Sequence, residues 1–299
     1  MRLGRRRRAL AAALLTLATA MAAPIAGAGA QAAGRSYPPV TLPGTELRTL
    51  RAASNGVPYR LYVALPPGYG AAGKRFPVVY MLDADYSFAI ARNIAEHLTV
   101  RGDLPAVVLV AIAYQPGGQE AYRANRTRDY TPTHSDSGGY GPDYQKLSGG
   151  APAFLRFIRD ELIPFVDSSY SVSSDRALVG HSYGGLFVLW TMLEEPTLFR
   201  RVIAVSPSLW YDRGVLLRLE ERRSAELRAM PVRLYAGVGG RENPRMASDL
   251  QRFTGQLRRH AYVGLEMDWR VLDTETHNSL FPIVLTEGLR WIYADLGAR

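Results

Sequence analysis

The sequence predicts an α/β sandwich in which helices cover both faces of a mostly parallel central sheet. Three observations support this fold class. Strand-like and helix-like segments alternate along most of the 299 residues. Continuous apolar runs at 76–82 and 106–113 are typical of parallel strands buried on both faces. Before them, two segments with alternating apolar and polar residues flank the turn sequence Ser54-Asn55-Gly56, which is typical of an antiparallel hairpin.

The elements follow one another along the chain. The hairpin strands are expected at 46–52 and 59–64, at a sheet edge, and further strands at 76–82, 106–113, 177–179, 202–205, 232–237 and 267–272. Helices are expected at 86–98, 151–166, 186–193, 215–227, 244–260 and 281–296. The segment 151–166 carries apolar residues at helical spacing, with Pro152 in its first turn.

Residues 114–150 are rich in Gly, Tyr, Asp and Arg and are expected to form one long irregular loop. The loop follows a parallel strand, at the carboxyl edge where such sheets bind ligands. We therefore expect it to face the substrate.

The N-terminus has the three parts of a secretory signal peptide. Five arginines lie between residues 2 and 8, an apolar run covers 9–23, and small residues at 26–33 offer cleavage sites. We expect residues 1–32 to be removed on export to a periplasm or to the medium. Residues 33–44 should then form an extended arm, and residues 45–299 one α/β domain.

Removing residues 1–32 lowers the formal net charge from +9 to +4, so most of the basicity belongs to targeting and not to a nucleic-acid interface. No other stretch is apolar enough to span a bilayer, and we expect no stable membrane insertion of the mature protein. The chain has no cysteine, which excludes disulfides, thiolate metal sites and a cysteine nucleophile.

The sequence Gly180-His181-Ser182-Tyr183-Gly184 lies between a short apolar run and a long apolar segment. This order predicts a strand, a sharp turn and a helix. The two glycines of G-x-S-x-G allow the strained turn that exposes the serine, and the helix directs its first amides at the group that the serine attacks. Ser182 is therefore the candidate nucleophile. The alternative is a tight turn in which Ser182 only caps the helix.

A serine nucleophile needs a base within hydrogen-bonding reach and an acid that orients the base. In G-x-S-x-G hydrolases the acid follows the serine and the histidine comes last. His277 is the candidate base, because it follows a strand and precedes the last helix. Glu242 is the first candidate for the acid, because it comes soon after the strand at 232–237. The alternatives are Asp249, Asp273 and Glu275.

An acyl-transfer site also needs two donors for the developing oxyanion, usually backbone amides. One is expected to be the amide of Tyr183, the residue after the nucleophile. The other is expected from the loop Leu82-Asp83-Ala84-Asp85-Tyr86, which follows an early strand. Two aspartates in one loop without a neighbouring ligand cluster do not indicate a metal site.

Beyond the G-x-S-x-G sequence, the chain contains the segments YMLDADYSF, RTRDYTPT, GGAPAFLRFIRDELIPFVDSSY, VIAVSPSLWYD and ETHNSLFP. Together, over roughly residues 45–295, they resemble the putative-esterase branch of the α/β-hydrolases, which contains esterase D-like enzymes and the enterochelin (siderophore) esterases. The resemblance implies no metal or cofactor. The site residues it implies are Ser182 as nucleophile, His277 as base, Glu242 as first choice of acid, and the amides of Asp85 and Tyr183 as oxyanion hole. The family often has Gly at the position of Ala84, which leaves the first amide donor open.

The same branch includes exported enzymes that cleave the ester bonds of catecholate siderophores. The residues that this resemblance suggests for an anionic catecholate ligand are Arg123, Arg126 and Arg128, with Tyr114 and Trp210 as aromatic walls. The alternative for the arginines is a solvated loop in which they pair with Asp129 and Glu120.

We therefore expect a serine carboxylic-ester hydrolase that forms an acyl-enzyme on Ser182, with siderophore-type catecholate trilactones as candidate substrates among small-molecule esters. Three alternatives remain. One is an acyltransferase like the mycolyltransferases, in which an alcohol replaces water as acceptor. The second is a non-catalytic ligand-binding protein of the same fold, and the third is a peptidase, although no extra domain restricts access to the site. The sequence does not indicate an oligomeric state.

Overall fold

The computed structural model describes residues 40–297 of the chain. The predicted signal peptide at 1–32 and most of the predicted arm at 33–44 lie outside the described residues, so both stay predictions. The folded unit begins at Leu42.

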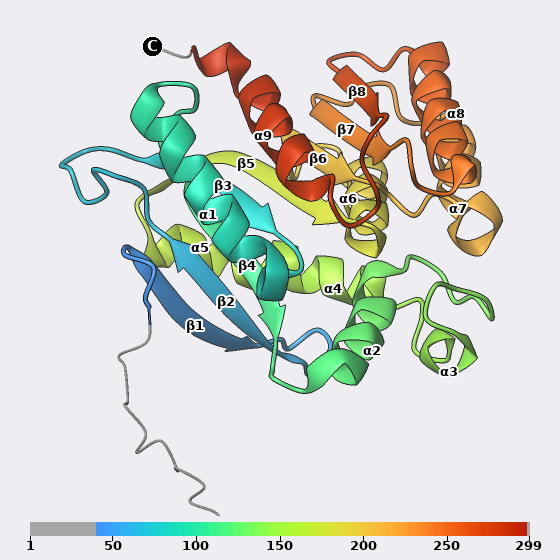
Figure 1. Cartoon of the computed structure of the whole chain (residues 1–299), viewed down its shortest axis with the longest axis horizontal. Helices are drawn as coiled ribbons and strands as arrows, with labels where there is room; N and C mark the ends of the chain where they lie inside the picture. The colour runs from blue at the N-terminus through green and yellow to red at the C-terminus, as the bar shows by residue number, and fades with distance from the viewer. Residues whose placement is uncertain (1–39, 298–299) are drawn as a thin grey trace, which may run out of the picture. The chain divides into compact units, whose positions relative to one another are not determined.

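Within residues 40–297, an eight-stranded sheet has the order β1-β2-β4-β3-β5-β6-β7-β8 (Figure 1). β1 pairs antiparallel with β2, and β2 with β4, whereas every other neighbouring pair is parallel. The predicted mostly parallel sheet with an antiparallel start is thus confirmed. The strands are β1 (Thr45–Arg51), β2 (Pro58–Ala64), β3 (Phe76–Met81), β4 (Val108–Tyr114), β5 (Val172–His181), β6 (Arg201–Val205), β7 (Arg233–Gly239) and β8 (Glu266–Leu272).

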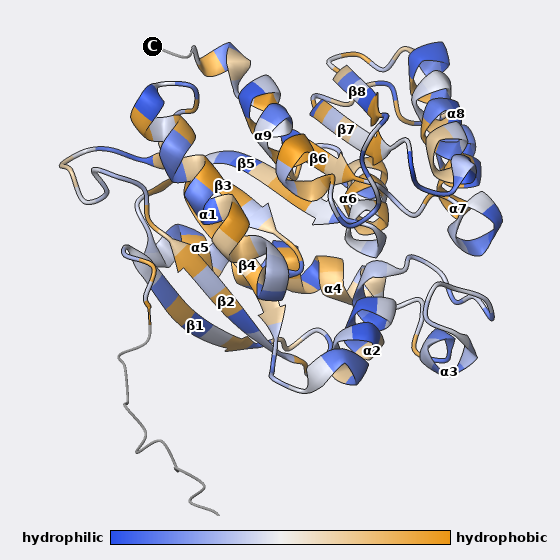
Figure 2. Cartoon of the chain, in the orientation of Figure 1, coloured by the Kyte–Doolittle hydropathy of each residue, from blue (hydrophilic) through white to orange (hydrophobic). Residues whose placement is uncertain are grey.

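Helices cover both faces of the sheet, as predicted, and each face has its own apolar core. α1 (Ala84–Arg101) and α9 (Phe281–Ile292) pack together on the face nearer the viewer in Figure 1. The remaining helices are α2 (Gly118–Tyr130), α3 (Pro142–Gln145), α4 (Ala151–Phe157), α5 (Ile163–Ser169), α6 (Tyr183–Glu194), α7 (Tyr211–Arg223) and α8 (Pro244–His260). Figure 2 shows that hydrophobic residues concentrate in the central strands, whereas hydrophobic and hydrophilic residues alternate along β1. Every residue of β4 and β6 is buried, which explains the continuous apolar sequences of β4 and of 202–205 in β6.

The prediction of one regular helix at 151–166 is wrong in one respect. The segment is helical, but it consists of α4, a π turn at Ile158–Leu162, and α5. Pro164 lies in the first turn of α5. Proline has no amide to donate, and its ring clashes with the carbonyl four residues earlier, so the local hydrogen bonding widens. Apolar periodicity continues through such a turn and does not reveal it.

The loop predicted at 114–150 is also a wrong assignment, because α2 and α3 lie within it. The residues that α2 buries are mostly polar, namely Arg126, Thr127, Asp129 and Tyr130. A helix that buries polar side chains has no apolar stripe, so hydrophobic periodicity could not detect it.

The carboxyl ends of β5 to β8 lie in register. His181 at the end of β5 lies opposite Val205 of β6, and Val205 lies opposite Gly237 of β7. Gly239 of β7 in turn lies opposite Leu272 of β8. Residues that follow these strands therefore gather at one edge of the sheet, where open α/β sheets bind ligands.

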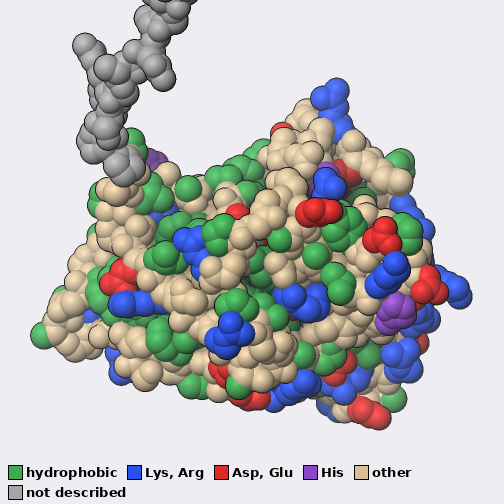
Figure 3. All heavy atoms as spheres, turned by 90° about the horizontal axis from the view of Figure 1, so that it is seen from below, with side chains coloured by type: hydrophobic (Ala, Val, Ile, Leu, Met, Phe, Trp, Pro, Cys, Tyr) green, Lys and Arg blue, Asp and Glu red, His purple; other side chains and the backbone are tan. Residues whose placement is uncertain are grey.

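Basic and acidic side chains are interspersed on the face drawn in Figure 3, with hydrophobic side chains scattered among them. Among residues 40–297, none of the helices is both long and apolar enough to cross a bilayer.

Candidate active site

Ser182 lies in the turn between β5 and α6, as the G-x-S-x-G sequence predicts. Its backbone has φ 61° and ψ −117°, a conformation that costs a non-glycine residue about 1–3 kcal/mol. The amide of Ser182 donates to the carbonyl of Val205 at 2.9 Å. A Cβ atom on Gly180 would lie 2.4 Å from the carbonyl oxygen of Gly184, so only glycine allows this close approach. The neighbouring strand and the glycines therefore hold the serine in its strained turn.

Glu242 and His277 form a hydrogen-bonded pair, with 2.7 Å between Glu242 Oε2 and His277 Nδ1. Glu242 is almost fully buried, and its Oε1 accepts the amide of Gly239 at 2.6 Å. Its Oε2 also accepts the hydroxyl of Ser206. Burial alone would raise the pKa of Glu242, but the hydrogen bonds from His277, Ser206 and Gly239 outweigh burial and hold that pKa below its ordinary value. The carboxylate is therefore ionised and able to orient the imidazole.

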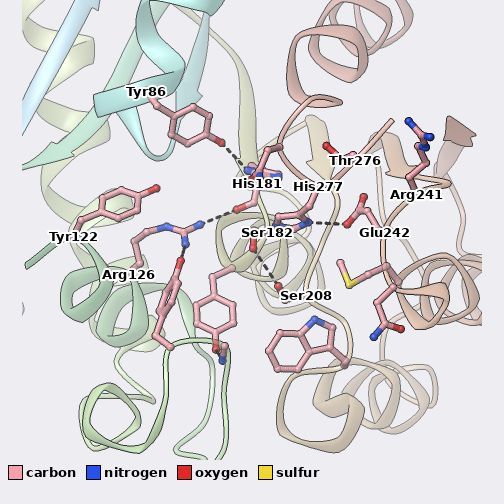
Figure 4. Close-up of a pocket in the computed structure, with 17 residues that line it drawn as sticks. Tyr86, Tyr122, Arg126, His181, Ser182, Ser208, Arg241, Glu242, Thr276 and His277 are labelled. Atoms are coloured by element: carbon pink, nitrogen blue, oxygen red, sulfur yellow. Dashed lines mark hydrogen bonds and ion pairs between the residues drawn. The ribbon is translucent and has the colours of Figure 1, made fainter. Parts of the chain in front are cut away.

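Ser182, Glu242 and His277 line one pocket of about 810 Å³ (Figure 4). Ser182 Oγ lies 3.5 Å from Ser208 Oγ. Among the described residues, no hydrogen bond joins Ser182 Oγ to His277. Hydrogen bonds between a nucleophile and its base are often long without substrate and tighten in the reacting complex.

The alternative acids occupy other places. Asp249 in α8 pairs with Arg245 at 3.2 Å and with Arg252 at 3.5 Å. The backbone of Asp273 packs against Gly240, and Glu275 accepts the hydroxyl of Ser279 at 2.6 Å. None of Asp249, Asp273 and Glu275 lines the pocket of Ser182. The structure thus brings the first candidate, Glu242, to the histidine.

The two residues expected to supply oxyanion-hole amides lie in the first turns of helices, Asp85 in α1 and Tyr183 in α6. Amides in a first turn have no acceptor within their own helix. The two helix starts are close, because a Cβ atom on Gly184 would lie 3.2 Å from Asp83 Oδ2. Tyr183 lines the pocket of Ser182, whereas Asp85 lines a neighbouring pocket with Tyr114.

Aromatic side chains form much of the pocket wall. Trp210 is one of them, as predicted. The sequence analysis did not identify the other residues of the wall, which are tyrosines, one methionine and several polar residues. The further lining residues are Tyr86, Tyr122, Tyr140, Met246, Arg241, Asn243, Thr276 and Asn278.

Arg126 lines the pocket, but its guanidinium forms its hydrogen bonds with other residues of the protein (Figure 4). It donates to Asp83 Oδ1 at 2.7 Å and to Oδ2 at 3.1 Å, and both side chains are buried. It also donates to the carbonyl of His181 at 3.0 Å and to the hydroxyl of Tyr140. Burial alone would lower the pKa of Arg126, but Asp83 outweighs burial and raises that pKa well above its ordinary value. Arg126 therefore ties the turn that holds Ser182 to the start of α1, and Asp83 neutralises its charge.

The structure places three other predicted substrate contacts outside the pocket of Ser182. Tyr114 is a core residue whose ring packs 5.8 Å from that of Tyr59, because the last position of β4 faces the helices. Arg128 forms a two-pronged pair with the buried Asp129, at 2.7 and 2.8 Å. Arg123 is exposed, with its guanidinium 5.8 Å from the ring centre of Tyr140. The pairing alternative therefore holds for Arg128.

His181, which sequence reasoning did not single out, lies against His277, the candidate base. Its ring centre is 4.6 Å from that of His277, and its Nδ1 lies 2.8 Å from the hydroxyl of Tyr86. Burial, followed by the proximity of His277 and Arg126, lowers the pKa of His181 to about 3. His181 is therefore neutral near pH 7, so it adds no charge to oppose an imidazolium at His277.

The buried neutral His181 should make folding sensitive to acid. The unfolded chain takes up a proton at His181 below pH 6.5, whereas the folded protein does not until about pH 3. The free energy of unfolding should therefore fall as the pH falls through this window, by about 2 kcal/mol between pH 7.5 and pH 5. Urea unfolding at both pH values measures the loss. His181→Asn, whose amide oxygen can replace Nδ1 as partner of Tyr86, should show a correspondingly smaller loss; equal pH dependence would contradict this account.

A strained serine between β5 and α6, followed in chain order by an acid and a histidine at the same edge of a mostly parallel sheet, is the arrangement of an α/β-hydrolase. The family model described as "Putative esterase" matches residues 52–278, and the chain belongs to this family.

Known relatives agree with the family. Ferri-bacillibactin esterase BesA of Bacillus subtilis (strain 168) is 28% identical over 270 residues, 84% of this chain and 90% of that protein. Siderophore triacetylfusarinine C esterase of Aspergillus fumigatus is 30% identical over 233 residues, 71% of this chain and 74% of that protein. A crystal structure of an IroE-like serine hydrolase from Shewanella oneidensis superimposes with a TM-score of 0.76 at 28% identity, covering 85% of this chain and 81% of that one. The chain is thus a carboxylic ester hydrolase.

Proposed function

We propose that this protein hydrolyses siderophore esters with Ser182 as nucleophile, His277 as general base and Glu242 as the acid that orients His277. The observation that carries the proposal is the hydrogen bond between the buried carboxylate of Glu242 and the partly exposed His277, in the pocket that also holds Ser182. Because Nδ1 of His277 is bound to the carboxylate, Nε2 is the nitrogen left to exchange a proton with Ser182.

The first half of the reaction forms an acyl-enzyme. Ser182 Oγ attacks the ester carbonyl while His277 Nε2 accepts the hydroxyl proton. The amides of Tyr183 and Asp85, in first turns without helical acceptors, are the proposed donors to the oxyanion. The tetrahedral intermediate then collapses, the bond to the alcohol breaks, and the leaving oxygen takes the proton from His277.

The second half regenerates the enzyme. A water molecule gives its proton to His277 Nε2 and attacks the acyl carbon, and the bond from that carbon to Ser182 Oγ breaks as His277 returns the proton to the serine. The neutral His181 beside His277 places no like charge next to the imidazolium that forms in both halves.

The choice of siderophore esters is supported by the names of relatives that act on bacillibactin and triacetylfusarinine C. The pocket, at about 810 Å³, has the size of a small-molecule site. Its tyrosines and Trp210 offer flat surfaces on which aromatic rings of a catecholate can stack. Export to a periplasm or to the medium, proposed from the sequence of residues 1–32, would place the enzyme where siderophores pass.

Covalent labelling combined with a substrate panel tests this function. A fluorophosphonate should modify the protein once, and peptide mass spectrometry should locate the adduct on Ser182. Unlabelled protein should hydrolyse a short-chain nitrophenyl ester and a catecholate trilactone, and labelled protein neither. Hydrolysis of the nitrophenyl ester alone would remove the siderophore assignment. Ester products with an added alcohol would favour the acyltransferase alternative, and absence of both labelling and turnover would favour the binding protein.

A further inference from the structure

Ser206 is the first residue after β6 and lies behind the Glu242–His277 pair. It is fully buried and does not line the pocket of Ser182. Its amide donates to the carbonyl of Gly237 at 2.7 Å, which fixes its position against β7. Its hydroxyl oxygen lies 3.0 Å from His277 Nδ1 and also contacts Glu242 Oε2.

The hydrogen-bond roles at this point follow from charge. The ionised Glu242 can only accept, so the hydroxyl proton of Ser206 must point to Glu242 Oε2. The Nδ1 proton of His277 is also directed to Oε2, and the Ser206 oxygen is a second acceptor beside it. One carboxylate oxygen thus serves two donors, and Ser206 touches both members of the pair.

The backbone of Ser206 gives an independent indication. Its φ is 43°, in the left-handed region that glycine adopts without cost and other residues rarely enter. A turn alone would favour glycine at this position. A strained serine with a fully engaged hydroxyl points instead to a role for the side chain.

We propose that Ser206 is a positioning residue that fixes the Glu242 carboxylate and weakens its hold on the proton of His277, so that the base is free at lower pH. The inference rests on the esterase function proposed above. A hydroxyl that donates to a carboxylate takes up part of its charge, and the carboxylate then stabilises the neighbouring imidazolium less. Replacing Ser206 also removes the 3.0 Å contact of its oxygen with Nδ1. The Nδ1 proton keeps its shorter 2.7 Å bond to Oε2, so loss of the donor to the carboxylate prevails. The imidazolium is then favoured, and more alkaline conditions are needed to release its proton.

Other titratable groups face the pair from several elements. His181, at the end of β5, has a pKa of about 3, and Tyr86 from α1 has its pKa raised well above the ordinary value by burial. Neither changes charge between pH 4.5 and pH 9. Arg126 from α2 has its pKa raised well above the ordinary value by Asp83, so it stays cationic, and Arg241 after β7 also lines the pocket. The carboxylates of Asp273 and Glu275 follow β8 nearby but do not line the pocket of Ser182. We therefore assign the fall of activity at acidic pH to the Glu242–His277 pair.

Two replacements separate the hydroxyl from the backbone turn. Ser206→Ala removes the hydroxyl and keeps the strain, whereas Ser206→Gly removes the hydroxyl and relieves the strain. In both, the acidic midpoint of kcat/KM should move to higher pH by about half a unit to one unit. We also expect kcat above the midpoint to fall roughly tenfold with little change in KM, because Ser206 does not line the pocket.

Two further variants serve as references. Ser206→Thr keeps a hydroxyl and should retain the wild-type midpoint in whatever fraction folds. Ser87→Ala removes a buried serine hydroxyl that bonds to the carbonyl of Leu82 and does not touch Glu242, so its midpoint should not move. Thermal unfolding of each variant checks that it is folded.

A second readout does not need turnover. The imidazole carbon signals of His277, assigned with a His277→Gln variant, can be followed by NMR across pH, and the titration midpoint should rise in Ser206→Ala and Ser206→Gly. An unchanged midpoint in both would overturn the proposal, and so would a shift in only one, because the backbone would then be the cause. If the wild-type protein neither reacts with fluorophosphonate nor turns over ester, the proposed function fails, while the NMR titration still decides the role of Ser206.

Discussion

Glu242→Gln is expected to lower kcat about 10,000-fold with little change in KM. The amide nitrogen of glutamine can donate to His277 Nδ1, which would place the imidazole proton on Nε2 instead. A protonated Nε2 cannot accept the proton of Ser182, so the base is lost although its position is kept. Steady-state hydrolysis of a nitrophenyl ester at pH 8 measures the effect.

Asp249→Asn is the matched control for this prediction. Asp249 was an alternative acid, and the structure places it in pairs with Arg245 and Arg252 on α8. Its replacement should leave kcat within about twofold, because Asp249 does not line the pocket of Ser182. Near-normal turnover in Glu242→Gln, together with a large loss in Asp249→Asn, would transfer the role of acid to Asp249.

Arg126→Met is expected to lower the free energy of unfolding by about 3–5 kcal/mol. The replacement keeps a similar length but leaves the carboxylate of Asp83 buried without its cation, at 1% side-chain exposure. The carbonyl of His181 and the hydroxyl of Tyr140 also lose a donor. Urea unfolding at pH 7.5 gives the loss directly.

Arg123→Met controls for the loss of an arginine from the same helix. Arg123 is exposed, and its guanidinium lies over the ring of Tyr140. We expect a change within about 0.5 kcal/mol. The double variant Asp83→Asn/Arg126→Met should recover part of the loss, because it removes the isolated charge. If Arg126→Met alone lowered the free energy of unfolding by less than about 1 kcal/mol, water would have to reach Asp83, and the Asp83–Arg126 pair would behave as a solvent-exposed ion pair.

The sheet and the three central site residues could be predicted because each depends on a local pattern. Apolar runs identify parallel strands, and G-x-S-x-G with its flanking strand and helix identifies the turn of Ser182. His277 and Glu242 follow from chain order, since residues just after parallel strands meet at one edge of the sheet. Neither inference requires knowledge of how side chains pack.

Of the five predicted substrate contacts, Arg126 and Trp210 line the pocket of Ser182, whereas Tyr114, Arg123 and Arg128 lie outside it. Arg126 and Arg128 looked like solvated cations available to a ligand, but both engage buried carboxylates, those of Asp83 and Asp129. The roles of His181 and Ser206 depend on a 4.6 Å ring contact and on a positive φ. Such features arise when segments distant in the sequence pack together, so residue spacing does not predict them.

The polar contacts that hold α2 against the rest of the protein bear on how the substrate specificity of this enzyme can change. Ser182, Glu242 and His277 follow strands held by two apolar cores, whereas α2, which supplies Tyr122 to the pocket wall, buries mainly charged and hydroxyl groups. The proposed reacting groups and this wall thus rest on largely different contacts, and Arg126 joins the two through His181 and Asp83. Substitutions on the exposed turns of α2 can reshape what the pocket accepts without disturbing the reacting groups, provided that Arg126 and Asp129 keep their partners. Selection for a new ester can therefore act on one helix while the chemistry is inherited unchanged.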